Sequence, residues 1–281
     1  MAGLFTLRFS NITWRTLQVK IAIVLIIGVL SCVIGLQYVT SQKFGGAENV
    51  AVMEQLHIVK GSGEYVLADP DGIRNFQKSW SEYGQDYYVD RLLKQKRRGF
   101  FVELGAHDGE SMSNTLFLEK ERDWNGILIE GNPIVYEKLL KKNRKCYSIN
   151  CCVSNDMNAM EFTLADHLSS ANVTMTKSQS KRINYIKKGH ADKDFGKVVT
   201  IKCQSFNDIM DAIGVNYIDF FSLDVEGAEL YILQSIDWRR FYIDIFFIET
   251  DQNRDDIIQY MSSVGYVHLG EHYHDDIFRR K

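Results

Sequence analysis

The chain has 281 residues, of which 45% are apolar and 25% are charged, and its formal net charge is −3. This composition suits one ordinary globular domain with additional segments. The slightly acidic balance offers no basic surface for nucleic acid, so no nucleic-acid partner is expected. With only two prolines, the chain has no proline-rich linker.

Residues 21–42 form a run of 22 residues without a charge. As a helix this run would be about 33 Å long, which matches a hydrocarbon core of roughly 30 Å. Arg8, Arg15 and Lys20 precede the run and no acid accompanies them. The positive-inside rule therefore predicts a cytosolic tail at residues 1–20 and a transmembrane signal-anchor helix at 21–42, with the rest of the chain across the membrane. A cleaved signal peptide is the alternative.

This orientation exposes two kinds of residue to a lumenal environment. Asn172 heads a glycosylation sequon, Asn-Val-Thr, on the predicted lumenal side. An oxidising lumen permits disulfides, although buried free thiols on strands are an equal alternative and the connectivity cannot be deduced. The cysteines concerned are Cys146, Cys151, Cys152 and Cys203.

A stem is predicted at residues 43–79, because glycines and the segment Asp-Pro-Asp-Gly at 69–72 interrupt any long periodicity. The folded domain is expected to begin near residue 80 and to continue to residue 281.

The most informative segment of the domain is residues 100–109, FFVELGAHDG. Its apolar start is typical of a parallel strand that is buried on both faces. Gly105 and Gly109 then allow a tight turn and a close backbone approach to a ligand, before a helix expected to start near residue 110. Another apolar strand at 126–129 ends at Glu130, at the distance where a nucleotide-binding α/β fold holds a ribose.

Charge distinguishes between nucleotide cofactors at this turn. Glu103, Asp108 and Glu110 lie close together in sequence, and each close pair with a pyrophosphate would cost roughly 4 kcal/mol at an effective dielectric near 20. S-adenosylmethionine has no phosphate and carries a sulfonium and an ammonium group. The sequence therefore favours S-adenosylmethionine over NAD or FAD, with an acidic surface turn that binds nothing as the alternative.

The remaining elements alternate between strands and helices, which predicts a doubly wound, mainly parallel α/β sheet. No helix separates the last two strands, so an antiparallel C-terminal edge is expected. Strands are predicted at 147–153, 160–164, 198–202, 219–223, 243–248, 266–269 and 277–280, and helices from 133 to about 143, at 205–213, from the segment 224–229 to 235, and at 255–263.

Several motifs resemble those of FkbM-type methyltransferases. The segment DFFSLDVEGAEL at 219–230 is similar to the signature of that family, and 81–86, 101–109, 113–115 and 124–133 match its other blocks in the right order. The last blocks look especially like the animal branch that includes the type II membrane protein Star. The resemblance covers roughly residues 80–281, with Gly131 as one departure, since the family more often has proline there.

The resemblance implies a class I methyltransferase fold that binds S-adenosylmethionine at the carboxyl ends of the strands. Glu103 is then expected to meet the ammonium or the methionine part of the cofactor, with Gly105 and Gly109 leaving space for it. Glu130 is expected to take both ribose hydroxyls. Asn150 is placed to meet the adenine edge, and Cys151 is an equal candidate.

Asp224 ends the fourth strand, where the methyl group should point, so it is the best candidate to orient the acceptor or accept a proton. Glu226 is the second catalytic candidate, with helix capping as the alternative. Glu229 is expected to be a solvated helix residue or a strut. No ligand spacing points to a metal. Among the histidines, His107 and His274 are the ones most expected near the site.

The resemblance leaves two functions open. One is an S-adenosylmethionine-dependent O-methyltransferase, anchored in the endoplasmic reticulum or Golgi membrane, that acts on a glycan or another small secretory acceptor. The other is a non-catalytic protein that binds cargo in vesicle-mediated trafficking. The polar stretch at 166–197, which carries several lysines, is either a loop that binds an anionic or glycan acceptor or a solvated helix face.

Overall fold

The computed structural model describes residues 49–74, 77–189 and 191–281. Residues 51–281 form one compact unit. Across the described residues, no helix combines the length and the apolar character needed to span a membrane. The anchor predicted at 21–42 lies outside the described residues, so it stays a prediction.

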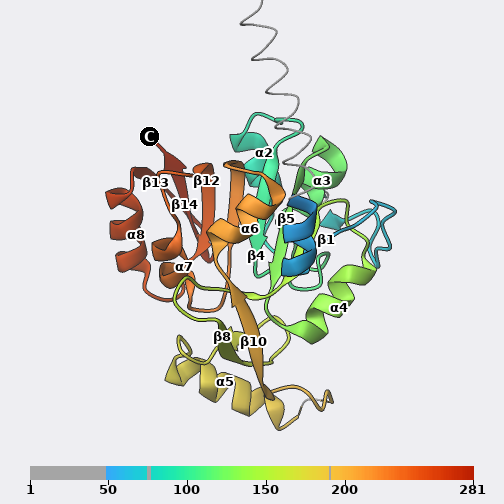
Figure 1. The fold of residues 1–281 in the computed structure, drawn as a ribbon, viewed down its shortest axis with the longest axis vertical. Helices are drawn as coiled ribbons and strands as arrows, with labels where there is room; N and C mark the ends of the chain where they lie inside the picture. Colours follow the sequence, from blue (N-terminus) through green and yellow to red (C-terminus); the bar gives the residue numbers. More distant parts are fainter. Residues whose placement is uncertain (1–48, 75–76, 190) are drawn as a thin grey trace, which may run out of the picture. The chain divides into compact units, whose positions relative to one another are not determined.

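An eight-stranded mixed sheet forms the centre of this unit (Figure 1). Neighbouring strands from β6 to β12 run parallel, whereas β14 is antiparallel to both of its neighbours. The mainly parallel sheet and the antiparallel pairing at its C-terminal edge were both predicted. In spatial order the strands are β1 (Val59–Lys60), β6 (Tyr147–Asn150), β5 (Asn125–Glu130), β4 (Phe100–Leu104), β11 (Tyr217–Leu223), β12 (Tyr242–Glu249), β14 (Asp275–Arg280) and β13 (Tyr266–His272).

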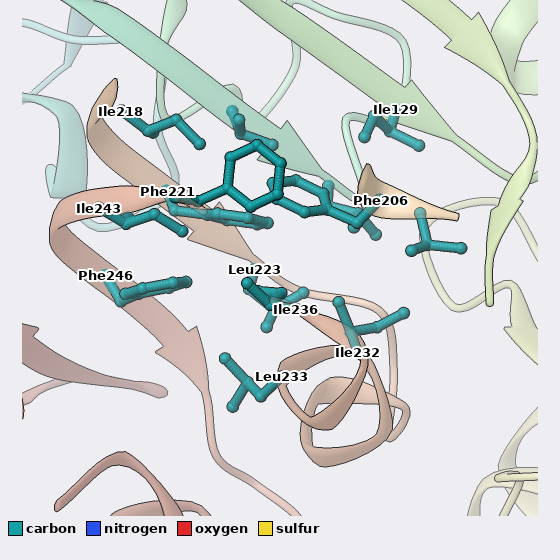
Figure 2. Packing of buried hydrophobic residues seen from close by; sticks show 14 of the residues in the cluster. Ile129, Phe206, Ile218, Phe221, Leu223, Ile232, Leu233, Ile236, Ile243 and Phe246 are labelled. Atoms are coloured by element: carbon teal, nitrogen blue, oxygen red, sulfur yellow. The ribbon is translucent and has the colours of Figure 1, made fainter. Parts of the chain in front are cut away.

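Helices cover both faces of the sheet. Successive residues of a strand point to opposite faces, so neighbouring side chains pack against different helices. Phe101 of β4 packs with α2 (Gln85–Leu92), α3 (Leu116–Arg122) and α4 (Pro133–Lys141) on one face. The next residue, Val102, packs with α6 (Phe206–Ile213), α7 (Glu229–Ser235) and α8 (Arg254–Ser263) on the other. Figure 2 shows this second cluster, in which Phe206 of α6 and Ile232 and Leu233 of α7 surround Phe221, Leu223 and Phe246 of the strands.

The strand order reverses at β4. Going along the chain, β5 and β6 are added on one side of β4, and β11 and β12 are added later on its other side. In open α/β sheets, ligands bind outside the carboxyl ends of the strands at such a reversal. The loops after β4 and β11 are therefore the expected borders of a binding site.

A smaller four-stranded sheet is inserted between β6 and α6. We call residues 152–204 the cap; it contains β7 (Cys152–Val153), β8 (Ala159–Thr163), β9 (Ser170–Ala171), β10 (Val198–Gln204) and the helix α5 (Lys177–Lys187). In Figure 1 the cap lies below the main sheet, with α5 outermost. Cys152 and Cys203 are aligned on neighbouring strands and form a disulfide, whereas Cys146 and Cys151 are buried free thiols.

Two elements differ from the prediction. The strand expected at 147–153 is divided at Cys151, because β6 belongs to the main sheet and β7 to the cap sheet. The helix expected near residue 110 begins only at Leu116, since Asp108 accepts hydrogen bonds from the backbone of Glu110 and Ser111 and holds a turn there.

The segment expected as a stem packs against the domain where the structure describes it. β1 pairs with β6 at the edge of the main sheet, and β2 (Ile73–Arg74) pairs with β3 (Gln77–Lys78). The backbone N–H groups of Ala68 and Asp69 donate to the Glu110 carboxylate at 2.9 and 2.5 Å. Residues 51–79 therefore belong to the compact unit that contains the sheet.

Candidate functional site

A cavity of about 300 Å³ lies at the carboxyl ends of β4, β5, β11 and β12. The loops after these strands form its floor, and the cap contributes residues such as Met160, Phe162 and Leu168. Its position is the strand-order reversal described above. A volume of this size is at the lower end of the range for small-molecule sites.

Gly105 allows the two loops at the reversal to touch. Its φ is +88°, and a Cβ atom at this position would lie 1.6 Å from the carbonyl oxygen of Asp224. Only glycine combines this backbone conformation with this approach. Gly109 also has a positive φ of +74°, but it faces Leu139 and is not among the residues that line the cavity.

Glu103 is buried and lines the cavity, and its carboxylate organises the loop that follows. One oxygen accepts the backbone N–H of Asn114 at 2.6 Å, and the other accepts the hydroxyls of Ser113 and Thr115 at 3.0 and 2.5 Å. Burial raises the pKa of Glu103, while nearby Arg144 opposes this shift. Glu103 thus fixes the wall formed by residues 113–115.

Arg144 is a buried residue that no sequence motif indicated. Its guanidinium donates to the carbonyl of Gly109 at 2.6 Å and to the Thr115 hydroxyl at 3.1 Å, and it pairs with the Glu119 carboxylate at 3.2 Å. These contacts join the glycine turn to the loop that Glu103 holds. Arg144 acts through these neighbours, because it does not line the cavity itself.

Of the three acids that the sequence placed around the glycine turn, only Glu103 lines the cavity. Asp108 closes the turn through backbone hydrogen bonds. Glu110 binds the segment at 68–69 and the Lys142 ammonium, which lies 2.5 Å from its carboxylate. The cavity is nevertheless acidic, because other carboxylates supply the charge.

Glu130 lies at the end of β5, and both of its carboxylate oxygens are oriented by backbone donors. The N–H of His107 donates to one oxygen at 2.8 Å, and the N–H of Asn132 donates to the other at 2.7 Å. Burial raises the pKa of Glu130 to about 7. Since each carboxylate oxygen can accept a second hydrogen bond, Glu130 can receive two hydroxyl groups of a ligand.

Asn150 does not line the cavity, in contrast to the expected contact with adenine. Its side-chain amide donates to the backbone carbonyls of Glu130 and Gly131 at 2.7 and 3.0 Å, so it supports the loop from below. Cys151, the alternative candidate, does line the cavity, as does Cys152 of the disulfide.

Asp224 and Glu249 meet at the ends of the neighbouring strands β11 and β12. Their carboxyl groups are hydrogen-bonded to each other, and oxygens of Asp224, Glu226 and Glu249 all lie within 4.8 Å of one another. Burial raises the pKa of both, and the repulsion between the neighbouring carboxylates raises each further. Asp224 lines the cavity and is exposed.

Glu226 and Glu229 belong to the turn that leads into α7. The Glu229 carboxylate accepts the N–H groups of Val225 and Gly227 at 2.9 and 3.0 Å, so Glu229 is a buried strut. Glu226 has a φ of +57°, a strained conformation for a residue with a side chain. Gln179 of the cap donates to the Glu226 carbonyl at 2.7 Å and stabilises this turn from above.

The cavity thus favours a positively charged ligand. Carboxylates face it from four strand ends, and within the described residues no lysine or arginine pairs with Asp224 or Glu249. A cation that enters would relieve the repulsion in this cluster, whereas a phosphate would increase it. The cluster of Asp224, Glu226 and Glu249 contains only carboxylates. From the sequence, no metal ligands had been predicted.

Several side chains join the cap to the loops around the cavity. The His107 imidazole faces the Asp166 carboxylate at 3.3 Å, and the Asn132 amide donates to the Ser169 hydroxyl at 3.0 Å. Asn172, the predicted glycosylation site, is half-buried in the cap, and its side-chain oxygen accepts the Thr163 hydroxyl at 2.6 Å.

Sequence reasoning missed several cavity residues that lie far apart along the chain. Glu249 is the last residue of β12, Asp251 follows this strand, and Tyr83 precedes α2. An acid directly after a predicted buried strand was the signal available for Glu249. Tyr83 lies within the block 81–86 that resembles the family, but it is not one of the matching residues of that block, and nothing in the local sequence marks Arg144.

Comparison with known proteins gives one family match. Residues 103–268 match the family model described as "Methyltransferase FkbM domain". No curated protein matches the chain. Among solved structures, the chain is similar to methyltransferase FkbM from Methylobacillus flagellatus, with 14% identity, a TM-score of 0.41, and coverage of 70% of this chain and 47% of that one. It is also similar to a TehB-like SAM-dependent methyltransferase from Corynebacterium glutamicum, with 10% identity, a TM-score of 0.39, and coverage of 72% and 89%.

Proposed function

The chain belongs to the FkbM methyltransferase family, and from this we propose that it is an S-adenosylmethionine-dependent O-methyltransferase anchored in a membrane of the secretory pathway. The observation that carries this proposal is the acidic cavity at the strand-order reversal, bordered by the glycine turn after β4 and the carboxyl pair of β11 and β12. When bound, S-adenosylmethionine supplies an electrophilic methyl group on a positively charged sulfur.

The residues around β5 fit the nucleoside part of this cofactor. The carboxylate of Glu130 is fixed by two backbone N–H groups and keeps one free acceptor position on each oxygen. The 2′- and 3′-hydroxyls of a ribose would occupy both positions. Next to it, Cys151 and Phe162 provide apolar surface for a base.

The residues at the ends of β11 and β12 fit the positively charged sulfonium of the cofactor. Asp224, Glu226 and Glu249 repel one another unless a proton or another cation lies among them. A sulfonium is attracted to such a site, and a neutral thioether is attracted less. The same charges disfavour an anionic acceptor, so we propose that the acceptor presents a neutral hydroxyl, as a glycan or another small secretory product does.

The chain contributes mainly positioning, because displacement at a methyl group requires the reacting atoms in line. Gly105 brings the loops after β4 and β11 into contact, and Glu103 fixes the wall at 113–115. Asp224 is the residue that we expect to orient the acceptor. The cap limits the access of water to the cavity.

The compartment is proposed from the sequence and from one structural feature. The apolar run at 21–42 and its basic flank predict a type II anchor in the endoplasmic reticulum or Golgi membrane, with the domain in the lumen. The disulfide between Cys152 and Cys203 supports an oxidising compartment. The glycine turn and the open cavity favour catalysis over the non-catalytic trafficking alternative, since a protein that only binds cargo needs neither.

Calorimetry with S-adenosylmethionine and S-adenosylhomocysteine tests this function on the detergent-solubilised full-length protein. We expect both to bind, and Glu130→Ala to weaken both by roughly 30- to 150-fold, which corresponds to about 2–3 kcal/mol for charge-assisted hydrogen bonds. Glu161→Ala is the matched control, because Glu161 is exposed on the cap and does not line the cavity. Absence of binding by both compounds would refute the proposal.

A further inference from the structure

A histidine and an aspartate form a pair at the mouth of the cavity. His274 lies in the turn between β13 and β14, and Asp251 follows β12. Both line the cavity, and His274 Nδ1 lies 2.9 Å from a carboxylate oxygen of Asp251. About half of each side chain is exposed, 54% for His274 and 56% for Asp251.

The surroundings hold this histidine in place. The His274 carbonyl accepts the backbone N–H of Thr250 at 3.0 Å, which joins the turn to the end of β12. The ring of Tyr83 lies 5.5 Å from the imidazole and is itself stacked on Tyr273 at 4.4 Å. With Nδ1 bound to Asp251, Nε2 has no partner among the described residues and remains available to a ligand.

The pair lies on the acceptor side of the cavity. Asp251 is two residues from Glu249, and its charge acts on both Glu249 and Glu226. Glu130, where we place the ribose, belongs to β5, and β4 and β11 separate it from β12. An acceptor that enters through the mouth therefore passes His274 before it reaches the carboxyl cluster.

We propose that His274, oriented by Asp251, is the general base that removes the proton from the acceptor hydroxyl; this inference rests on the proposed function. The hydroxyl proton passes to Nε2 of His274, and the oxygen uses its electron pair to form the new bond to the methyl carbon. The electron pair of the broken carbon–sulfur bond stays on sulfur, which becomes neutral. The imidazolium then returns its proton to solvent at the exposed mouth.

His107, the other histidine expected near the site, is less suited to this role. Its Nδ1 is buried without a hydrogen-bond partner among the described residues, and its Nε2 faces Asp166 of the cap. Burial and the neighbouring carboxylates raise the pKa of Asp224 and Glu249, which favours their protonated forms. His274 combines a free ring nitrogen, an orienting carboxylate and a position at the entrance, which is the arrangement that general-base catalysis needs.

The charges around His274 come from three segments. Asp251 follows β12, Asp275 begins β14, and Glu82 precedes α2. The hydrogen bond and charge of Asp251, with smaller contributions from Glu82 and Asp275, raise the pKa of His274 above its usual 6.5. Methyl transfer should therefore increase with pH as His274 loses its proton.

Transfer of tritiated methyl groups tests the base directly. The full-length protein in detergent is incubated with [methyl-³H]S-adenosylmethionine and solubilised secretory membranes as the acceptor source. We expect His274→Gln to reduce incorporation at least 100-fold, within the range known for general bases, with unchanged cofactor affinity. His268→Gln is the matched control, because His268 pairs with Asp276 at 2.6 Å on the same hairpin but outside the cavity.

The positioning role of Asp251 needs a second readout. Asp251→Asn should lower the pKa of His274, measured by NMR titration of the ¹³C-labelled imidazole, and should move the pH–rate profile in the same direction. An ordinary pKa for His274 in the unmodified protein, or incorporation retained by His274→Gln, would overturn the inference. Failure of every protein, including the unmodified one, to bind the cofactor or transfer a methyl group would count against the proposed function as well.

Discussion

Gly105 determines whether the two loops at the strand-order reversal can meet. Its backbone lies in the left-handed region, and its Cα faces the carbonyl of Asp224. Asp224 lies at the end of the strand beside which the methyl group is expected. The shape of the site therefore depends on the lack of a Cβ atom at residue 105. This requirement could be predicted from the sequence as a need for glycine, but its contact partner could not.

Replacing Gly105 by alanine should therefore damage both stability and binding. The new Cβ would overlap the Asp224 carbonyl and strain the backbone, so we expect a loss of about 3 kcal/mol or more in the free energy of unfolding. Gly265→Ala is the control, since Gly265 has a φ of +96° but open space around it. That variant should lose about 1–2 kcal/mol. Equal losses in urea unfolding of the two variants would contradict the contact.

The raised pKa of Glu130 predicts how the affinity for the cofactor depends on pH. Its pKa of about 7 means that it is largely protonated at pH 6 and ionised at pH 8. Only the ionised form has both acceptor positions free for ribose hydroxyls, so affinity for S-adenosylhomocysteine should rise by about tenfold in total between pH 6 and pH 8. Glu130→Gln should flatten this dependence in calorimetry. A wild-type affinity that is constant across this range would contradict the assignment of Glu130.

Glu130 should also affect the stability of the ligand-free protein. Here the effect of pH is opposite, because stability should fall as pH rises. A carboxyl group whose pKa is raised on folding contributes stability below its unfolded pKa and loses it as pH rises through about 7. Ligand-free Glu130→Gln should therefore melt above the unmodified protein at pH 8 and close to it at pH 5. Function thus requires a residue that lowers stability at neutral pH.

Among the candidate site residues, the sequence was most informative where a functional group directly follows a buried strand. Glu130 and Asp224 lie at strand ends, and both line the cavity. Asn150 has the same position at the end of β6, yet its side chain turns to the backbone of the neighbouring loop. Which way a side chain points at a strand end depends on neighbours that are distant in sequence, and single-sequence patterns do not contain that information.

At the scale of elements, the strands were easier to predict than the boundaries of the cap. Short apolar runs bounded by turns identify β4, β5, β11 and β12, because a central parallel strand has no polar face. The division of residues 147–153 at Cys151 was missed, since no glycine or proline interrupts the run and only the change from one sheet to another breaks it. The helix α5 was left open between a loop and a solvated helix, and its single buried residue, Ile183, explains why its periodicity is weak.

The disulfide at the base of the cap should matter for the cap more than for the main sheet. Cys152 and Cys203 are separated by 51 residues, and closing such a loop stabilises a fold by about 2–4 kcal/mol. We expect Cys203→Ser to lower the free energy of unfolding by this amount. Hydrogen exchange should become faster within residues 154–202 and stay unchanged in β4 and β5. Unchanged exchange in the cap would show that its other contacts are sufficient.

At the scale of the whole molecule, the chain combines a methyltransferase-family domain with a predicted anchor at 21–42. In sealed microsomes, added protease should leave the domain intact until detergent is present, because the domain is expected in the lumen. The tail at 1–20 should be digested in both conditions. Glycosidase treatment should reduce the mass if Asn172 carries a glycan. Digestion of the domain in intact microsomes would contradict this orientation.

The proposed function depends above all on where the cofactor binds. A crystal structure of the full-length protein with S-adenosylmethionine should show the ribose hydroxyls on the Glu130 carboxylate and the sulfonium beside Asp224, within the cavity that β4, β5, β11 and β12 border. Cofactor density elsewhere, or a cavity that stays closed by its own side chains at saturating cofactor, would contradict it.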